Sequence, residues 1–64
     1  MCLSKAYVDR NSKRELLMQE IASLEVSNDG RLLLKTLFGQ QKEIGANIKK
    51  IDFLTHSIFL EKYR

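Results

Sequence analysis

Apolar and polar residues alternate at the two ends of the chain, the pattern of a strand with one face buried and the other exposed. Residues 2–8 place on one side Cys2, Ser4, Ala6 and Val8, and on the other Leu3, Lys5 and Tyr7. Residues 57–63 place on one side Ile58 and Leu60, and on the other Phe59 and Tyr63. We therefore predict a strand at each end, with a turn at residues 9–12 after the first.

Residues 13–26 fit two patterns. Ser12 and Glu15 have the spacing of a capping box, and Leu17, Ile21 and Leu24 recur at helical intervals among good helix formers. The same stretch also fits two short alternating strands with a break near residues 19–20. The local pattern leaves both interpretations open.

A hairpin is predicted around residues 28–30, because a three-residue loop with Gly30 in the left-handed position is a favoured connection between strands. Its register pairs Val26 with Leu32 and Leu24 with Leu34, which brings apolar residues together on one face. A strand that ends at Val26 makes a helix over residues 13–25 less favourable.

The second half of the chain continues as short strands. After a central strand over residues 31–37, we expect a turn at 37–40, a strand at 42–44 and a bend or bulge at 45–46. In the next segment a bulge at residues 49–50 would return Ile51 and Phe53 to the side of Ile48. Residues 54–56 then form a tight connection to the last strand.

These segments predict one all-β domain over residues 1–64, a small barrel of six or seven short antiparallel strands, SH3-like in character. A chain of this size buries only about 60% of the surface that it exposes when unfolded. Its single cysteine cannot form an internal disulfide, so a metal or a second copy is the usual means of stabilising such a domain. We therefore expect a homodimer.

Charge gives a weaker indication of function. The formal charge is +3 and the pI about 9.3, but basic and acidic residues are interleaved. The only adjacent basic pairs are Lys13-Arg14 and Lys49-Lys50, whereas a nucleic-acid footprint typically gathers its charge on one face. A single cysteine, without an apolar stretch typical of a signal peptide or a membrane span, predicts a soluble protein of the reducing cytoplasm.

Cys2 lies beside the chain terminus, where three donor atoms can converge on one metal ion. The Met1 α-amine, the Cys2 amide nitrogen and the Cys2 Sγ form fused five-membered chelate rings without help from distant residues. Nickel(II) and copper(II) favour tetragonal fields with nitrogen donors, and the soft thiolate disfavours magnesium and calcium. The simpler interpretation of Cys2 is a small buried residue at the start of a strand.

Two ligand sets stay open. If Met1 is retained, one chain supplies three ligands and leaves one position free. If Met1 is removed, Cys2 supplies its amine and thiolate, and two chains of a dimer complete an N2S2 square.

Other residues offer less chemistry. His56 is the only histidine and imidazole is a common nickel ligand, but a residue in a predicted turn is more simply a solvated or hydrogen-bonded loop residue. The chain has no glycine-rich phosphate loop, and Glu43, Asp52 and Glu61 are interpreted as surface partners of neighbouring lysines. We therefore predict that the protein is not an enzyme.

Several short motifs together resemble one family. They are Met1-Cys2-Leu3, Ala6-Tyr7-Val8, Leu37-Phe38-Gly39, Ile44-Gly45-Ala46-Asn47-Ile48, Ile51-Asp52-Phe53 and His56-Ser57-Ile58-Phe59-Leu60-Glu61. Their order and spacing, and the length of the chain, resemble the CooT family of small nickel-binding accessory proteins, whose members were earlier labelled predicted RNA-binding proteins. The resemblance covers almost the whole chain.

The resemblance implies a small β-rich, barrel-like homodimer that binds nickel(II) near the dimer interface through Cys2, and through the terminal amine of Met1. It also implies strands over residues 14–26. The implied role is nickel delivery to carbon monoxide dehydrogenase or another nickel enzyme.

The main alternative is a small basic barrel that binds RNA, since such barrels hold single strands with basic residues and stacking aromatics. The candidate residues are Tyr7, Phe38, Phe59, Tyr63, Arg31, Lys49 and Lys50. Packing of these aromatics in the core or in a dimer interface is the simpler interpretation for a chain this small. A structural subunit that docks onto a larger protein is a third hypothesis.

Overall fold

The computed structural model describes residues 3–10 and 12–62. These residues form strands and no helix: β1 (Ser4–Arg10), β2 (Lys13–Val26), β3 (Leu32–Thr36), β4 (Gln41–Ile44), β5 (Ala46–Asp52) and β6 (Ser57–Lys62). The strands form one sheet in the order β4-β3-β2-β1-β6-β5, which confirms the all-β prediction. Over the described ranges, no helix is long and apolar enough to cross a membrane.

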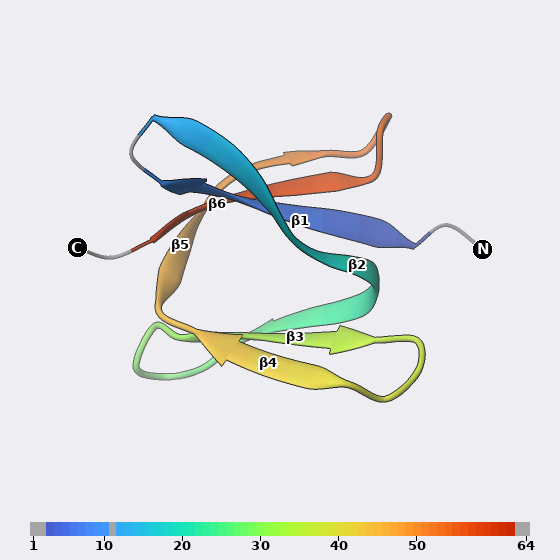
Figure 1. Cartoon of the computed structure of the whole chain (residues 1–64). Helices are drawn as coiled ribbons and strands as arrows, with labels where there is room; N and C mark the ends of the chain where they lie inside the picture. Colours follow the sequence, from blue (N-terminus) through green and yellow to red (C-terminus); the bar gives the residue numbers. More distant parts are fainter. Residues whose placement is uncertain (1–2, 11, 63–64) are drawn as a thin grey trace.

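The sheet curls into a half-barrel because β2 belongs to both of its layers (Figure 1). The first half of β2 pairs with β1 and the second half with β3. Between them Glu20 has a φ of 58°, in the left-handed region that residues other than glycine seldom adopt. At the far side of the sheet β4 passes through Gly45 directly into β5, so the two edge strands follow one another in the chain.

Strand β2 resolves the ambiguity over residues 13–26, and the helical interpretation is wrong. The 14 residues of β2 form a single bent strand. The break expected near residues 19–20 coincides with the bend at Glu20. Pairing with a neighbour on each side outweighs the helix propensity of this stretch, as tertiary context often does.

One strand pair departs from the predicted antiparallel arrangement. β1 and β6 run parallel, with Tyr7 beside Phe59 and Val8 beside Leu60. A parallel pair requires a long connection between its strands, and here β2 to β5 supply it. The sheet is therefore mixed.

The core lies on the concave side of the half-barrel. Its buried residues come from every strand and are Ala6, Val8, Ile21, Leu32, Leu34, Ile44, Ala46, Ile58 and Leu60. Leu34 and Leu60 are the largest that are completely buried. The predicted alternation is confirmed for Ala6 and Val8, and for Ile58 and Leu60.

The predicted hairpin is confirmed. Val26 pairs with Leu32 and Leu24 with Leu34. Gly30 has a φ of 85°, and the Ser27 amide donates to the Arg31 carbonyl at 2.9 Å. The turn at residues 37–40 is also present, with Gly39 at a φ of 88°.

The first turn is shorter than predicted. Asp9 and Arg10 continue β1 and pair with Arg14 and Lys13. Ser12, next to this pair, adopts a φ of 66°. Residues 9–12 are polar and were therefore predicted to form a turn. Asp9 and Arg10 are nevertheless part of the strand, because pairing across to β2 stabilises them without burial.

The bulge in β5 is confirmed, but Phe53 does not join the core. A register shift between Ile48 and Lys50 places Ile51 opposite Ile58. The Asp52 Oδ1 accepts hydrogen bonds from the Leu54 and Thr55 amides at 3.0 and 3.3 Å, so the strand turns before Phe53 can align with it. Phe53 is consequently 82% exposed.

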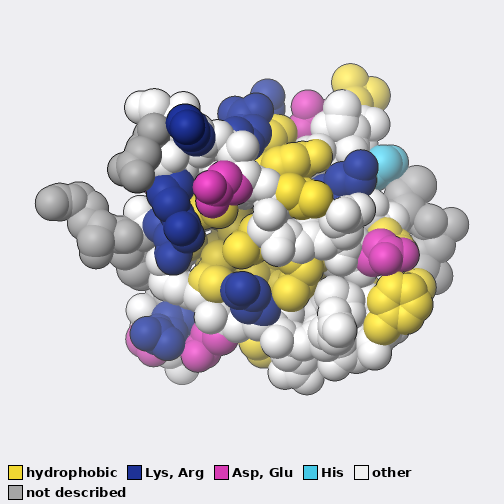
Figure 2. All heavy atoms as spheres, viewed as in Figure 1, with side chains coloured by type: hydrophobic (Ala, Val, Ile, Leu, Met, Phe, Trp, Pro, Cys, Tyr) yellow, Lys and Arg dark blue, Asp and Glu magenta, His cyan; other side chains and the backbone are white. Residues whose placement is uncertain are grey.

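One side of the half-barrel is open. Ile48 and Ile51 lie opposite the core residues Leu60 and Ile58, yet they remain 38% and 43% exposed. Figure 2 shows hydrophobic side chains uncovered in the middle of one face of the molecule. The edge strands therefore only partly enclose the core.

Candidate functional site

The predicted metal ligands Met1 and Cys2 lie outside the described residues. The described chain begins at Leu3, which is half-buried, and β1 starts at Ser4. Ser4 pairs with Ile21 of β2, and Lys5 pairs with Ser57 of β6. The segment next to the candidate ligands is therefore held by a strand on each side.

A backbone hydrogen bond connects this segment to the β5–β6 turn. The Lys5 amide donates to the His56 carbonyl at 2.9 Å. His56 is exposed and has a φ of 54°, as the last residue of the turn. The interpretation of His56 as a loop residue is confirmed, and its backbone lies beside the start of β1.

Polar contacts order the β5–β6 turn and leave its apolar side chains in solvent. Besides the contacts of Asp52, the Thr55 Oγ1 lies 3.0 Å from the Ser57 Oγ in a hydrogen bond. Leu54 at the tip is 93% exposed. An ordered turn with large exposed apolar side chains is typical of an interaction surface.

The β3–β4 turn lies at the same end of the molecule as the start of β1, the bend of β2 and the β5–β6 turn (Figure 1). The Leu37 amide donates to the Glu20 carbonyl at 3.0 Å, which fixes this turn against the bend. The buried Thr36 Oγ1 accepts from the Phe38 and Gln40 amides at 3.2 and 3.1 Å. Leu37 and Phe38 are 52% and 69% exposed.

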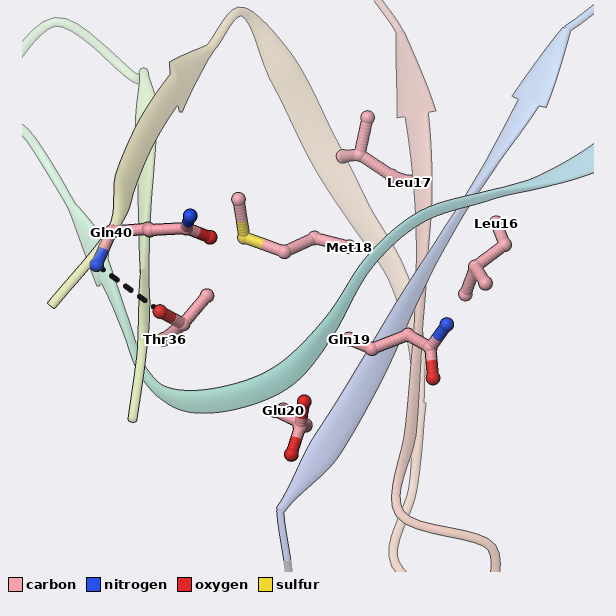
Figure 3. A pocket seen from close by; sticks show the side chains of 7 residues that line it. All are labelled: Leu16, Leu17, Met18, Gln19, Glu20, Thr36 and Gln40. Atoms are coloured by element: carbon pink, nitrogen blue, oxygen red, sulfur yellow. Dashed lines mark hydrogen bonds between the residues drawn. The ribbon is translucent and has the colours of Figure 1, made fainter. Parts of the chain in front are cut away.

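An open pocket of about 380 Å³ lies between β2 and this turn. Its lining residues are Leu16, Leu17, Met18, Gln19, Glu20, Thr36 and Gln40. The Met18 side chain points toward that of Gln40 (Figure 3). Sequence reasoning did not find this pocket, because it depends on the bend at Glu20.

The described residues contain no group of three or more His, Cys, Asp or Glu side chains that could hold a metal ion. Glu20 is the only ionisable residue among those that line the pocket. The donor set on which the metal hypothesis depends is thus the terminal one, at Met1 and Cys2.

The structure brings together some of the candidate nucleic-acid residues. Tyr7 and Phe59 stack with their ring centroids 5.6 Å apart, and the Lys50 Nζ lies 5.8 Å from the Phe59 centroid. Arg14, which sequence reasoning missed, places its Cζ 4.4 Å from the same centroid. Only the register of β1 between β2 and β6 reveals this cluster.

The other candidates lie elsewhere. Phe38 belongs to the β3–β4 turn, and Tyr63 lies outside the described residues. Arg31 pairs with Glu43 at 3.3 Å. Lys49 pairs with Asp9 at 2.7 Å, so its ammonium is engaged.

Asp9 is the electrostatic centre of this part of the surface. A hydrogen bond from Lys49 lowers the pKa of the Asp9 carboxyl, and the nearby Arg14, 3.6 Å away, adds to the effect. The same hydrogen bond raises the pKa of Lys49. Asp9 therefore stays ionised near neutrality, and its charge is compensated by two cations.

Comparison with known proteins identifies relatives of this chain. The sequence model of the family described as CO dehydrogenase accessory protein CooT matches residues 1–61. A crystal structure of a protein assigned as CooT from Carboxydothermus hydrogenoformans superposes with a TM-score of 0.86 at 35% sequence identity, covering 98% of this chain and 100% of that one. No curated protein matches the sequence.

Proposed function

This chain belongs to the CooT family, and we propose that it binds nickel(II) through Cys2 and assists delivery of the ion to an enzyme such as carbon monoxide dehydrogenase. The family is one of accessory proteins, which confirms the prediction that the protein is not an enzyme. The observation that carries the proposal is the family match over residues 1–61, which includes the terminal Met1-Cys2 donor set.

The chemistry of the terminus supports nickel as the cargo. An amine, an amide nitrogen and a thiolate suit a tetragonal ion, and the chelate rings form within two residues. The start of β1, which follows this terminus, is paired on both sides: Ser4 pairs with β2 and Lys5 pairs with β6. A fixed strand start reduces the conformational freedom that a terminal chelate loses when it binds the ion.

A homodimer is part of the proposal. The β3–β4 and β5–β6 turns lie at the end of the molecule where β1 starts, and they carry four large exposed apolar residues: Leu37, Phe38, Phe53 and Leu54. Each aromatic side chain can bury ~150–250 Å², so the group approaches one side of an interface of about 800 Å² per partner. A two-fold contact at this end would bring two termini together and allow an N2S2 site.

Anaerobic titration with nickel(II), followed by absorbance and calorimetry, tests the site. We expect a sulfur-to-nickel charge-transfer band in the wild type that saturates near one ion per dimer, and loss of the band in Cys2→Ser. The matched control is Ser4→Ala, which changes a nearby hydroxyl and should keep the band. Intact mass recorded on the same sample decides between the two ligand sets, because it reports whether Met1 is present.

Equal nickel affinity in the wild type and in Cys2→Ser would contradict the proposal. Delivery is tested separately, by activating nickel-free carbon monoxide dehydrogenase with the loaded protein in the presence of a chelator. Free nickel at the same total concentration should activate more slowly under these conditions. Equal activation by both would remove the delivery role while leaving nickel binding intact.

The dimer is tested by light scattering coupled to size-exclusion chromatography. The double variant Phe53→Ser/Leu54→Ser should weaken dimerisation by at least tenfold, because apolar area leaves the interface. Val26→Ser, which changes a residue 62% exposed on β2, is the control and should leave the dimer unchanged. An unchanged dimer in the double variant would exclude this end as the interface.

A further inference from the structure

The outer face of the β1–β6 pair carries an aromatic stack that no other strand covers. Tyr7 and Phe59 are neighbours on parallel strands, and their ring planes are inclined by only 19°. Parallel strands are usually covered on both faces. Here both rings are half-buried on the side opposite the core.

Cations from the two flanking strands lie over the Phe59 ring. Arg14 comes from β2, on one side of β1, and its guanidinium carbon is 4.4 Å from the Phe59 centroid. Lys50 comes from β5, on the other side of β6. Arg14, Tyr7, Phe59 and Lys50 thus form one continuous group across four strands, here called the aromatic platform.

Charge on this face favours an anionic partner. Its outward-facing cations are Lys5, Arg14, Lys49 and Lys50, and its outward-facing carboxylates are Asp9, Asp52 and Glu61. Asp9 is compensated by Lys49 and Arg14, and Asp52 is engaged with the amides of its own turn. Arg14 is therefore shared between the Asp9 carboxylate and the Phe59 ring, whereas Lys50 forms no ion pair with any residue that the structure describes.

We propose that the aromatic platform binds single-stranded nucleic acid. A base stacks on the planar guanidinium of Arg14, which itself lies on Phe59, while the half-buried Tyr7 ring stacked beside Phe59 extends the same surface. Lys50 contacts a backbone phosphate at the edge of the stack. An acidic peptide would use the cations alone, so the rings favour a ligand that has planar groups as well as negative charge.

The test uses the full-length protein and a fluorescently labelled single-stranded oligouridylate of about twelve nucleotides, with anisotropy as the readout. The single phosphate contact of Lys50 predicts a slope of about −0.7 for the logarithm of affinity against the logarithm of salt concentration. We expect Arg14→Lys, which keeps the charge and loses the planar group, to weaken binding at least fivefold. Lys42→Ala removes a charge from the exposed face of β4 and should weaken it less than twofold.

Further arms identify the ligand and exclude an unfolding artefact. Unlabelled single strands should displace the probe at least tenfold better than a duplex of the same length or polyglutamate. Circular dichroism should show that Arg14→Lys is folded, and Cys2→Ser should bind the probe as the wild type does, which separates this function from nickel binding. Absence of binding at low salt, equal affinity of Arg14→Lys and wild type, or equal displacement by polyglutamate would each overturn the proposal.

Discussion

Strands β1 and β6 show two different surfaces. On the inner side Ala6 and Leu60 are completely buried, with Val8 and Ile58 at 2% and 8% exposure. On the outer side Tyr7 and Phe59 are only half-buried, and cationic side chains from neighbouring strands lie over the Phe59 ring. The same pair of strands therefore has a buried core on one face and a partly accessible surface on the other.

The difference shows where sequence can change with little loss of stability. Inner residues contact other strands on all sides, so removing volume there leaves a cavity. Outer residues interact chiefly with each other and with solvent. We expect variants of the outer face to affect binding more than folding, and variants of the inner face to affect folding first.

The largest expected effect is that of Leu60→Ala on the inner face. Deleting a completely buried leucine side chain costs about 2–5 kcal/mol, and ~3 kcal/mol corresponds to a decrease of about 12–24 °C in the midpoint of thermal unfolding for a domain of this size. Circular dichroism on heating measures it. A decrease smaller than that caused by changing Phe59 would remove the distinction between the two faces.

An intermediate effect is expected for Phe59→Leu on the outer face. The variant keeps an apolar side chain but loses the ring stack with Tyr7 and the contact with the Arg14 guanidinium. Such aromatic and cation–π contacts contribute about 1 kcal/mol at exposed sites, which lowers the midpoint by ~4–8 °C. Denaturant unfolding of Phe59→Leu, Arg14→Met and the double variant should show that the two changes are not additive.

The smallest effect is expected for Asp9→Asn, and it depends on pH. The pKa of Asp9 is lowered in the folded protein chiefly by the hydrogen bond from Lys49. Asp9 therefore stabilises the fold fully above the ordinary pKa of a carboxyl, and this stabilisation is lost as the pH falls through the pKa of Asp9 in the folded protein. The pKa of Lys49 is raised in the folded protein, so the stabilisation that its charge provides is lost only as the pH rises through that raised pKa.

The difference in unfolding midpoint between wild type and Asp9→Asn should therefore be small and constant near neutrality, and should disappear in acid. Thermal unfolding over a series of pH values measures it. Lys35→Ala, which removes a separate surface pair with Glu25, is the control and should leave the contribution of Asp9 unchanged. A difference that grows in acid would show that another group is responsible.

Much of the fold was predictable because its signals are local. Gly30 and Gly39 mark turns that require a positive φ, and the alternation of Ala6 and Val8, or of Ile58 and Leu60, requires one buried face. The bulge near Lys49 follows from an interruption of the same alternation. These features need no knowledge of distant residues.

The candidate site was predictable only in part. Cys2 could be proposed as a metal ligand from the sequence alone, since the proposed chelate would involve adjacent atoms and require no fold. For the aromatic platform, the sequence indicated that aromatic and basic residues are present but not which of them meet, because Arg14 and Phe59 are 45 positions apart in the chain. Register between non-consecutive strands decides whether such residues meet.

The sequence by itself determined the hairpin register and the two-sided alternation of the terminal strands. The tertiary structure decided the parallel pairing of β1 with β6, the bend of β2 at Glu20 and the exposure of Phe53. The physical reason is that each of these depends on contacts between segments far apart in the chain. Alternation within a strand fixes which face is apolar, but only the packing of the whole sheet fixes which neighbour that strand will have.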